Sequence, residues 1–589
     1  MAGFSKVLVA NRGEIAIRIF RTLRELGIAP VAVYSEADRG SLHVRAADEA
    51  FLVGPGPAAE SYLAQERVID AARRSGAEAI HPGYGFLAEN SAFARAVEDA
   101  GLVWVGPPAD AIEIMGSKVA ARERMEAAGV PIIPGTTEPV ATAEEVTALG
   151  DELGWPIAIK ASAGGGGKGL KVVRSADEVE RAFESAQREG EAYFSDPAVY
   201  VERYLEDPRH VEVQVLADAH GSVIHLGERD CTIQRRHQKL VEETPSPAVS
   251  EELRARIGQI AVDAAKAVGY RSAGTIEGLL SRDGEYFFLE MNTRIQVEHT
   301  VTELVTGLDL VREQVLIAAG EPLRLRQEDV HLNGHAVECR INAEDPSNGF
   351  LPSPGRITAY REPAGPGIRV DSGVEAGSDV VGIYDPLIAK LCVHGVDREH
   401  ARLRMLRALR EYRIEGVTSL LGFHEALLEH PCFAKGETCH GVVESDELSA
   451  RAAELSRRAT SAVSSPDGAG PTRERVVNAE LDGRRFELKL HLPEPPHAAL
   501  VRRRRERMSE RAHGGAARDA VVSPMQGTVL AVEVAEGDEV RPGQVLCIVE
   551  AMKMENEITA SRAGRVSELS VEPGQAVRTG QVICVVQSE

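Results

Sequence analysis

The C-terminal part of the chain contains an internal repeat, which limits the possible folds more than any other sequence feature. When residues 527–550 are aligned with residues 564–587, eleven of 24 positions are identical. Both copies alternate apolar and polar residues, which is the periodicity of a β-strand. Two similar β halves would pack into one small symmetric sandwich or barrel. The sequence therefore predicts an all-β domain over residues 521–589.

The segment that joins the two repeats carries a single lysine. Lys553 is the only lysine in residues 521–589, and the whole chain has 11 lysines beside 56 arginines. A chain that meets its need for positive charge with Arg keeps Lys more often where an amine is required. Lys553 is therefore a candidate attachment point for a covalent group, and an ordinary exposed lysine in a hairpin is the alternative.

Length and charge exclude some classes of protein. At about 150 residues per domain, 589 residues suggest about four folding units. The net charge of −23 argues against a general nucleic-acid binder, because affinity for phosphate backbones comes largely from Lys and Arg. No apolar run approaches the roughly 20 residues of a membrane span. Seven sparse cysteines without a CxxC pair predict a reducing, cytoplasmic location and no disulfide.

The N-terminal part alternates short apolar runs with helical patterns. Over residues 1–115 this alternation predicts βαβ units and a parallel sheet covered by helices. Residues from about 130 to 205 form a smaller α/β unit. The Ser/Ala/Pro/Gly-rich residues 455–475 predict a linker, and a hairpin around Asp482-Gly483 follows. The basic run 502–507 belongs to a second linker and is either a solvated tether or a contact for an acidic partner.

A run of glycines follows an apolar strand and is flanked by lysines. Lys160 comes before the run, which consists of Gly164, Gly165, Gly166, Gly167 and Lys168. Glycines allow backbone N–H groups to approach phosphate oxygens. We therefore predict a mobile lid over phosphate groups, with Lys118 as a third cation. A flexible turn that binds nothing is the alternative.

Two acidic residues are predicted to lie opposite each other on a hairpin. If Asp283-Gly284 forms a two-residue turn, Glu277 and Glu290 are cross-strand partners. Directly opposed carboxylates are unfavourable unless a cation bridges them, and Mg²⁺ prefers such oxygen ligands together with phosphates. Asn292, on the same face, adds an amide oxygen. A solvated acidic face with the pair splayed apart is the alternative.

The residues from 292 to 299 combine an amide, a guanidinium, a carboxylate and an imidazole. Arg294 offers paired donors to a small oxyanion, and Glu298 is a candidate general base. A buried structural network is the alternative. A second polar run, residues 235–239, is a weaker candidate for binding anionic groups.

Long motifs in a fixed order connect these features. They are ANRGEIA, HPGYGFLAEN, MGSK, KASAGGGGKG, DCTIQRRHQK, EMNTRIQVEH and RINAEDPSNGFLPSPG, and EAMKM follows within the β repeat. The first seven resemble the biotin carboxylase component of biotin-dependent carboxylases, which is an ATP-grasp enzyme. EAMKM and its flanking repeat resemble the biotinyl carrier domain. The fused arrangement resembles the biotin-containing α chain of bacterial acyl-CoA carboxylases.

This resemblance implies an α/β fold with an all-β C-terminal domain. The expected parts are a Rossmann-like pre-ATP-grasp domain (1–115), an ATP-grasp domain (116–335) with a mobile lid at about 132–205, a biotin carboxylase C-terminal domain (336–450), a linker with a small β element (451–520) and a barrel-sandwich biotinyl domain of the lipoyl type (521–589). The implied ligands are ATP, Mg²⁺ or Mn²⁺, bicarbonate, and biotin joined to Lys553.

The resemblance also implies a role for each motif residue. The expected ATP contacts are Lys118, Lys160, Gly165, Gly166, Gly167, Lys168, Glu202, Leu205, His210, Gln234 and His237. The expected metal ligands are Glu277, Glu290 and Asn292. Bicarbonate would be held by Arg294, Gln296 and Val297, with Lys239 nearby. Glu298 would deprotonate bicarbonate, and Arg340 would stabilise the developing biotin enolate.

The chain departs from the family pattern at three positions without losing an assigned group. Thr300 stands where many relatives have Pro, Gly278 where many carry Phe, and Ser419 where Asn is common.

Two alternatives to this enzymatic function are left open. They are an inactive carrier or scaffold, and an ATP-grasp ligase with a lipoyl domain.

The expected partners follow from the absence of room for a carboxyltransferase in this chain. The resemblance implies a separate carboxyltransferase β chain that selects the acyl-CoA, with residues 476–492 as the candidate contact. It also implies a biotin protein ligase and a homo-oligomer within a hetero-oligomer, and neither nucleic acid nor membrane as a partner.

Overall fold

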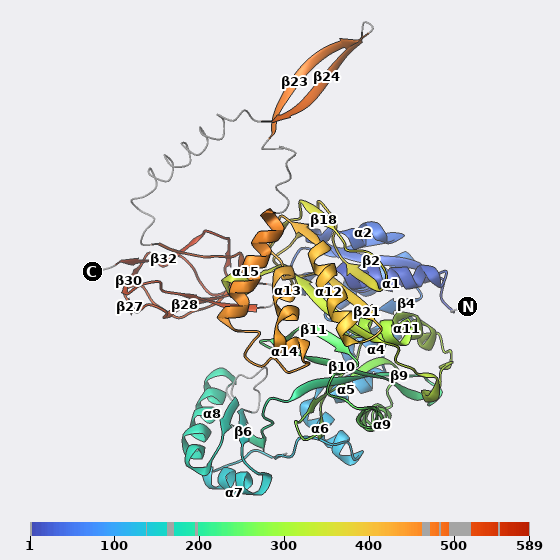
Figure 1. Ribbon diagram of the computed structural model, residues 1–589, viewed down its shortest axis with the longest axis vertical. Helices are drawn as coiled ribbons and strands as arrows, with labels where there is room; N and C mark the ends of the chain where they lie inside the picture. Colours follow the sequence, from blue (N-terminus) through green and yellow to red (C-terminus); the bar gives the residue numbers. More distant parts are fainter. Residues whose placement is uncertain are drawn as a thin grey trace. The chain divides into compact units, whose positions relative to one another are not determined.

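The computed structural model describes eight stretches of the chain, which are residues 3–136, 138–161, 170–194, 198–461, 472–481, 484–493, 520–551 and 554–587 (Figure 1). The chain divides into two compact units. The first comprises residues 1–381 and 386–453, and the second comprises residues 382–385 and 454–589. Several predicted features lie outside the described residues: the glycines Gly165, Gly166 and Gly167, Lys168, the turn residues 482–483, the basic run 502–507, and Lys553.

A five-stranded parallel sheet opens the first unit, in the order β3-β2-β1-β4-β5. The strands are β1 (Lys6–Val9), β2 (Ala29–Ser35), β3 (Glu49–Gly54), β4 (Ala79–His81) and β5 (Val103–Trp104), with helices α1 (Gly13–Glu25), α2 (Leu42–Ala46), α3 (Gln65–Ser75) and α4 (Ser91–Asp99). Every strand pair is parallel. The parallel sheet predicted from the alternation of apolar runs and helical patterns is therefore confirmed.

A small lobe with its own core follows α5 (Ala109–Gly116) and α6 (Lys118–Ala127). Its antiparallel sheet has the order β7-β6-β8. The elements are α7 (Ala143–Leu153), β6 (Ile157–Ala161), β7 (Leu170–Val173), α8 (Val179–Phe194) and β8 (Val199–Arg203). The predicted smaller α/β unit is thus present, and the glycine run lies between β6 and β7.

An eight-stranded antiparallel sheet forms the centre of the first unit, in the order β13-β12-β9-β10-β11-β14-β21-β19. The strands are β9 (Arg209–Ala217), β10 (Val223–Arg235), β11 (Gln238–Thr244), β12 (Ser272–Leu280), β13 (Tyr286–Asn292), β14 (His335–Asn342), β19 (Ile368–Ser372) and β21 (Leu387–Gly395). The accompanying helices are α9 (Glu251–Ala267), α10 (His299–Thr306), α11 (Leu310–Ala318), α12 (Arg398–Glu411), α13 (Leu421–Glu429), α14 (Pro431–Ala434) and α15 (Asp446–Ser461). Because β11 pairs with β14, segments on both sides of residue 335 share one sheet.

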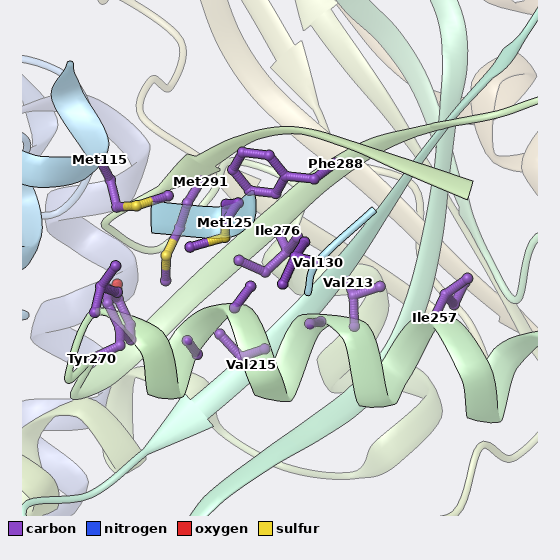
Figure 2. Close-up of a cluster of buried hydrophobic side chains, with 14 of the residues drawn as sticks. Met115, Met125, Val130, Val213, Val215, Ile257, Tyr270, Ile276, Phe288 and Met291 are labelled. Atoms are coloured by element: carbon purple, nitrogen blue, oxygen red, sulfur yellow. The ribbon is translucent and has the colours of Figure 1, made fainter. Parts of the chain in front are cut away.

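One face of this sheet packs on α9 through a continuous apolar cluster. Figure 2 shows its side chains, which include Met115 and Met125, Val213 and Val215 of β9, Ile257 of α9, and Phe288 and Met291 of β13. This core fixes β9, β12 and β13 against a helix, so the polar side chains that these strands carry elsewhere have a rigid support.

Short strand pairs complete the first unit. They are β15 (Glu344–Asp345) with β16 (Leu351–Pro352), β17 (Gly355–Arg356) with β20 (Asp379–Val380), and β18 (Ala359–Arg361) with β22 (Arg413–Glu415).

The prediction of no disulfide is wrong, because Cys432 and Cys439 form one. The turn at α14 brings their Cα atoms within 5.5 Å over a separation of seven residues. The other five cysteines are free and buried.

The second unit contains a hairpin and an all-β domain. In the hairpin, β23 (Thr472–Leu481) pairs with β24 (Arg484–Pro493) from Thr472 opposite Pro493 to Leu481 opposite Arg484, as predicted. The all-β domain has two four-stranded sheets, in the orders β25-β32-β30-β27 and β29-β28-β26-β31. Its strands are β25 (Ala520–Val522), β26 (Gly527–Val532), β27 (Glu539–Val540), β28 (Val545–Ala551), β29 (Met554–Thr559), β30 (Gly564–Ser567), β31 (Ala576–Val577) and β32 (Val582–Gln587). The predicted β domain built from two similar halves is confirmed.

Candidate active site

The strand register of the large sheet aligns four charged residues across adjacent strands. Glu277 lies opposite both Glu290 and Glu212, and Glu212 lies opposite Arg229. Opposed residues share a face of the sheet. Two strand pairs that are separated in sequence, β9 with β10 and β12 with β13, therefore present one polar row, which runs from β13 to β10.

The opposition of Glu277 and Glu290 confirms the prediction, but the geometry of the turn differs from the one assumed. The loop spans three residues between Ser281 and Glu285, whose backbone groups are hydrogen bonded. A register shift between Glu277 and Gly278 then restores the expected pairing. The prediction of a two-residue turn is therefore wrong, and the bulge compensates for the longer loop.

The ammonium of Lys239 joins three carboxylates. Its Nζ donates to Glu212 Oε2 at 2.5 Å, Glu277 Oε1 at 2.9 Å and Glu298 Oε1 at 2.7 Å. Burial lowers the pKa of Lys239, but the carboxylates, Glu212 first, raise it well above its usual value. Lys239 is therefore a permanent cation at the point where the polar row meets Glu298.

Glu298 lies between two cations. Its Oε2 accepts a hydrogen bond of 2.8 Å from Arg340 Nη2, while its other oxygen is held by Lys239. Burial raises the pKa of Glu298, but Lys239, Arg340 and Arg229 together hold it well below its usual range. Glu298 is thus an ionised acceptor in a fixed orientation.

Arg340 also lies close to a second pair of carboxyls, those of Glu242 and Glu338. Glu242 accepts from Arg340 Nε at 2.6 Å, and Glu338 is its cross-strand partner. Burial, opposed in part by Arg340, raises the pKa of Glu242 to about 8. Thr300 donates its hydroxyl proton to Glu338, so the departure from Pro at this position supplies a hydrogen bond to a buried carboxyl.

Glu277 and Asn292 are hydrogen bonded to residues that are expected to bind bicarbonate. Glu277 Oε1 accepts from Asn292 Nδ2 at 2.8 Å and from Gln296 Nε2 at 2.5 Å. Asn292 Oδ1 accepts from Arg294 Nη2 at 2.6 Å. The motif from 292 to 298 therefore converges on the Glu277 carboxylate.

Glu290 differs from its partner in being exposed. Desolvation and the neighbouring Glu277 carboxylate raise the pKa of Glu290. Within the part of the chain that the structure describes, no hydrogen bond or ion pair neutralises it. Two carboxylates and an amide oxygen are the donors that Mg²⁺ prefers, so this set fits a divalent cation.

Sequence reasoning missed two residues that organise the site, Arg229 and Glu212. Arg229 is completely buried and donates to Glu212 Oε1 at 2.5 Å and Gln296 Oε1 at 2.6 Å. It also donates to three further acceptors, which are Gln214, Thr302 and Thr275. For Glu212 the available signal was a carboxylate among the mostly apolar residues of β9, since a charged residue must be paired when it is buried. Arg229 stands between Glu228 and Asp230 in β10 and carries no such signal.

The residues expected to contact ATP are less tightly connected. Lys160 and Glu202 form an ion pair between β6 and β8. Leu205 packs with Ile133 and Phe287, and His210 Nε2 lies 2.8 Å from Glu277 Oε2. The remaining positions are Lys118, which is exposed at the start of α6, His237, which is exposed in the β10–β11 turn, and Gln234, which donates to the Cys231 carbonyl.

Four domain families match the chain. They are the biotin carboxylase N-terminal domain at residues 3–112, the carbamoyl-phosphate synthase L chain ATP-binding domain at 117–326, the biotin carboxylase C-terminal domain at 338–445 and the biotin-requiring enzyme domain at 519–586. The chain is 46% identical to the biotin-dependent acyl-coenzyme A carboxylase alpha3 subunit of Mycobacterium leprae, over 95% of each chain. The chain belongs to the biotin carboxylase family, in the form that carries its own biotin carrier domain.

Two further relatives match the carboxylase part. A pyruvate carboxylase subunit of Methanothermobacter thermautotrophicus is 54% identical over 74% of this chain and 88% of its own length. The crystal structure of the biotin carboxylase domain of Hydrogenobacter thermophilus 2-oxoglutarate carboxylase, solved with MgADP and bicarbonate, has a TM-score of 0.69 and 48% identity, and the match covers 75% of this chain and 99% of that one. Among the described residues, no helix is long and apolar enough to cross a membrane.

Proposed function

We propose that this chain uses ATP and bicarbonate to carboxylate biotin attached to Lys553, as the α subunit of an acyl-CoA carboxylase. The observation that supports this most directly is the junction at Lys239. One ammonium is bonded to Glu212, Glu277 and Glu298, and Arg340 holds the far side of Glu298. This supports the proposal because one cation joins Glu277, proposed as a metal ligand, to Glu298, proposed as the base.

Glu298 is the base in this proposal. It accepts the bicarbonate proton, and the bicarbonate oxygen attacks the γ-phosphorus of ATP as the bond to ADP breaks. The product, carboxyphosphate, decomposes to CO₂ and phosphate. N1 of biotin then attacks CO₂, and phosphate accepts the N1 proton while Arg340 stabilises the enolate charge. Because Lys239 and Arg340 hold the pKa of Glu298 well below its usual range, Glu298 is ionised before bicarbonate binds.

Other residues position the two substrates. Arg294, Gln296 and Val297 hold bicarbonate beside Glu298, and Glu277, Glu290 and Asn292 hold a magnesium ion, which would neutralise charge on the ATP phosphates. The proposed ATP contacts are Lys118, Lys160, Gly165, Gly166, Gly167, Lys168, Glu202, Leu205, His210, Gln234 and His237. Carboxyphosphate is lost if water reaches it, so closure of the lobe that carries β6 to β8 over the site is part of the proposal.

A separate carboxyltransferase β chain completes the reaction by transferring the carboxyl group to acetyl- or propionyl-CoA. The match to the Mycobacterium leprae acyl-coenzyme A carboxylase subunit spans both the carboxylase and the carrier parts, whereas the match to the pyruvate carboxylase subunit covers 74% of this chain. The match over both parts supports the proposed role as an α subunit of this kind.

The β23–β24 hairpin is the proposed contact with the β chain. An isolated two-stranded hairpin is marginally stable in water and gains stability by packing on another surface. Deletion of residues 476–492 should abolish co-purification with the β chain while ADP release stays unchanged. Unchanged co-purification would exclude the hairpin as the contact.

The deciding experiment measures ADP release by the purified chain with magnesium and ATP, with and without bicarbonate and free biotin. Release that requires both ligands is the expected result. A folded, ATP-binding protein that biotin does not stimulate would instead be an idle carrier or scaffold. Intact mass separates biotin from lipoate on Lys553.

A further inference from the structure

Two buried side chains hold consecutive backbone carbonyls in the loop between β13 and α10. His299 Nδ1 lies 2.7 Å from the carbonyl oxygen of Gln296, and Lys390 Nζ donates to the carbonyl oxygen of Val297 at 2.9 Å. Both side chains are completely buried. This loop carries Gln296, Val297 and Glu298, which the proposed function places around bicarbonate.

Lys390 occupies a position where a lysine is costly unless it is paired. It lies on β21, opposite Arg340 on one side and Asp371 on the other. Its Nζ is 3.3 Å from Glu14 Oε2 and 3.9 Å from Asp371 Oδ2. Burial lowers its pKa, but Glu14, Glu338 and Asp371 raise it above its usual value, so the ammonium stays charged.

His299 makes the corresponding contact with the preceding carbonyl, that of Gln296. A carbonyl oxygen can only accept, so the 2.7 Å contact places the imidazole proton on Nδ1. Burial and the nearby cations, Lys390 first, lower the pKa of His299 well below its usual value, and the ring is therefore neutral. A neutral donor and a charged donor thus act on adjacent peptide groups.

Because the peptide group is planar, these contacts also fix the direction of the N–H group in each peptide. In a trans peptide the C=O and the N–H point in opposite directions. Fixing the carbonyls of Gln296 and Val297 therefore turns the N–H groups of Val297 and Glu298 away from His299 and Lys390. We propose that Lys390 and His299 are positioning residues that aim these two N–H groups at bicarbonate, an inference that rests on the proposed function.

The test compares variants by their Michaelis constants. Lys390→Met should raise KM for bicarbonate at least tenfold and change KM for ATP less than twofold. His299→Asn, whose amide can replace the Nδ1 donor, should stay near wild type, whereas His299→Leu should follow Lys390→Met. Arg254→Met is the matched control, because Arg254 pairs with buried Glu228 and makes no contact with the 296–298 loop among the described residues.

The outcomes separate positioning from plain stability. If Lys390→Met and Arg254→Met lower the melting temperature and affect both KM values alike, the positioning role is wrong. If Lys390→Met does not fold, the contrast between His299→Asn and His299→Leu decides.

Binding of ¹³C-bicarbonate, followed by NMR line broadening, separates failure of this proposal from failure of the proposed function. Suppose that the wild type binds bicarbonate and Lys390→Met does not, but the wild type shows no bicarbonate-dependent ADP release. The proposed function would then be wrong, and the positioning role would stand. Absence of wild-type binding would overturn both.

Discussion

Arg229 is the residue whose replacement tests the polar row most directly. Its guanidinium supplies donors to five different side chains, and a lysine cannot reach them all from one nitrogen. We expect Arg229→Lys to lower the turnover number for bicarbonate-dependent ADP release at least tenfold, because Glu212 and Gln296 lose their common support. Each buried acceptor left unpaired also costs about 1–3 kcal/mol. Wild-type turnover in a folded Arg229→Lys protein would contradict this role.

Glu290 offers a cleaner test of the metal site than Glu277. Glu290 is exposed and unpaired among the described residues, whereas Glu277 also holds Lys239, Asn292 and Gln296. Glu290→Gln should raise the magnesium concentration at half-maximal ADP release about tenfold. The melting temperature should not fall, since the substitution removes repulsion from Glu277. Glu285→Gln, in the loop just before β13, is the control and should leave the magnesium requirement unchanged.

At the scale of single residues, the sequence predicts site residues that lie close together in one motif. It does not predict residues that are brought together only by the register of paired strands. Glu298 and Arg294 belong to one run of residues, and their chemistry is visible in that run. Arg229 and Glu212 are 17 residues apart and meet because β9 pairs with β10 in one register. A shift of one residue would turn Glu212 to the other face, so no count along the chain finds this pair.

Among the elements, the β12–β13 hairpin explains a departure from the family pattern. A Cβ at Gly278 would overlap the ring of Tyr286, so an aromatic side chain of β13 fills the space beside the glycine. Gly278→Phe alone should destabilise the protein by about 1–3 kcal/mol through overpacking. The additional change Tyr286→Ala should recover part of this loss, as thermal unfolding of the four proteins in a double-mutant cycle will show. Additive losses would contradict the exchange of volume between the two positions.

The same hairpin shows why element types are easier to predict than their details. Alternating and continuous apolar runs indicate strands, and β12 and β13 are where those runs predict them. The three-residue loop and the compensating bulge depend on packing beneath the strands, where Phe288 and Met291 join the α9 core (Figure 2). Local turn rules contain no information about that core.

For the whole carrier domain, the repeat predicted two halves but not how they combine. Each sheet contains strands from both repeats: β27 pairs with β30 of the second copy, and β26 pairs with β31. The corresponding pairs in the two sheets are equivalent under the sequence repeat. The halves therefore interlock, and neither has a complete sheet without the other.

The stability of the whole molecule should respond to pH through buried groups of opposite sign. Burial lowers the pKa of His81 to about 3 and raises that of Glu344 to about 7. The His81 ring is neutral in the folded protein, so its contribution is complete above about pH 6.5, where the unfolded ring titrates, and is lost as the pH falls towards 3. The folded Glu344 carboxyl keeps its proton, so its contribution is complete below about pH 4.5 and is lost as the pH rises through 7.

Two substitutions separate these effects. Relative to wild type, His81→Gln should gain stability as the pH falls below about 6.5, whereas Glu344→Gln should gain stability as the pH rises from about 4.5 to 7. The limiting slope is about 1.4 kcal/mol per pH unit for each group. Melting temperatures of the full-length variants between pH 5 and 7.5 measure both slopes. Differences from wild type that stay constant over this range would show that burial does not shift the pKa of these two groups.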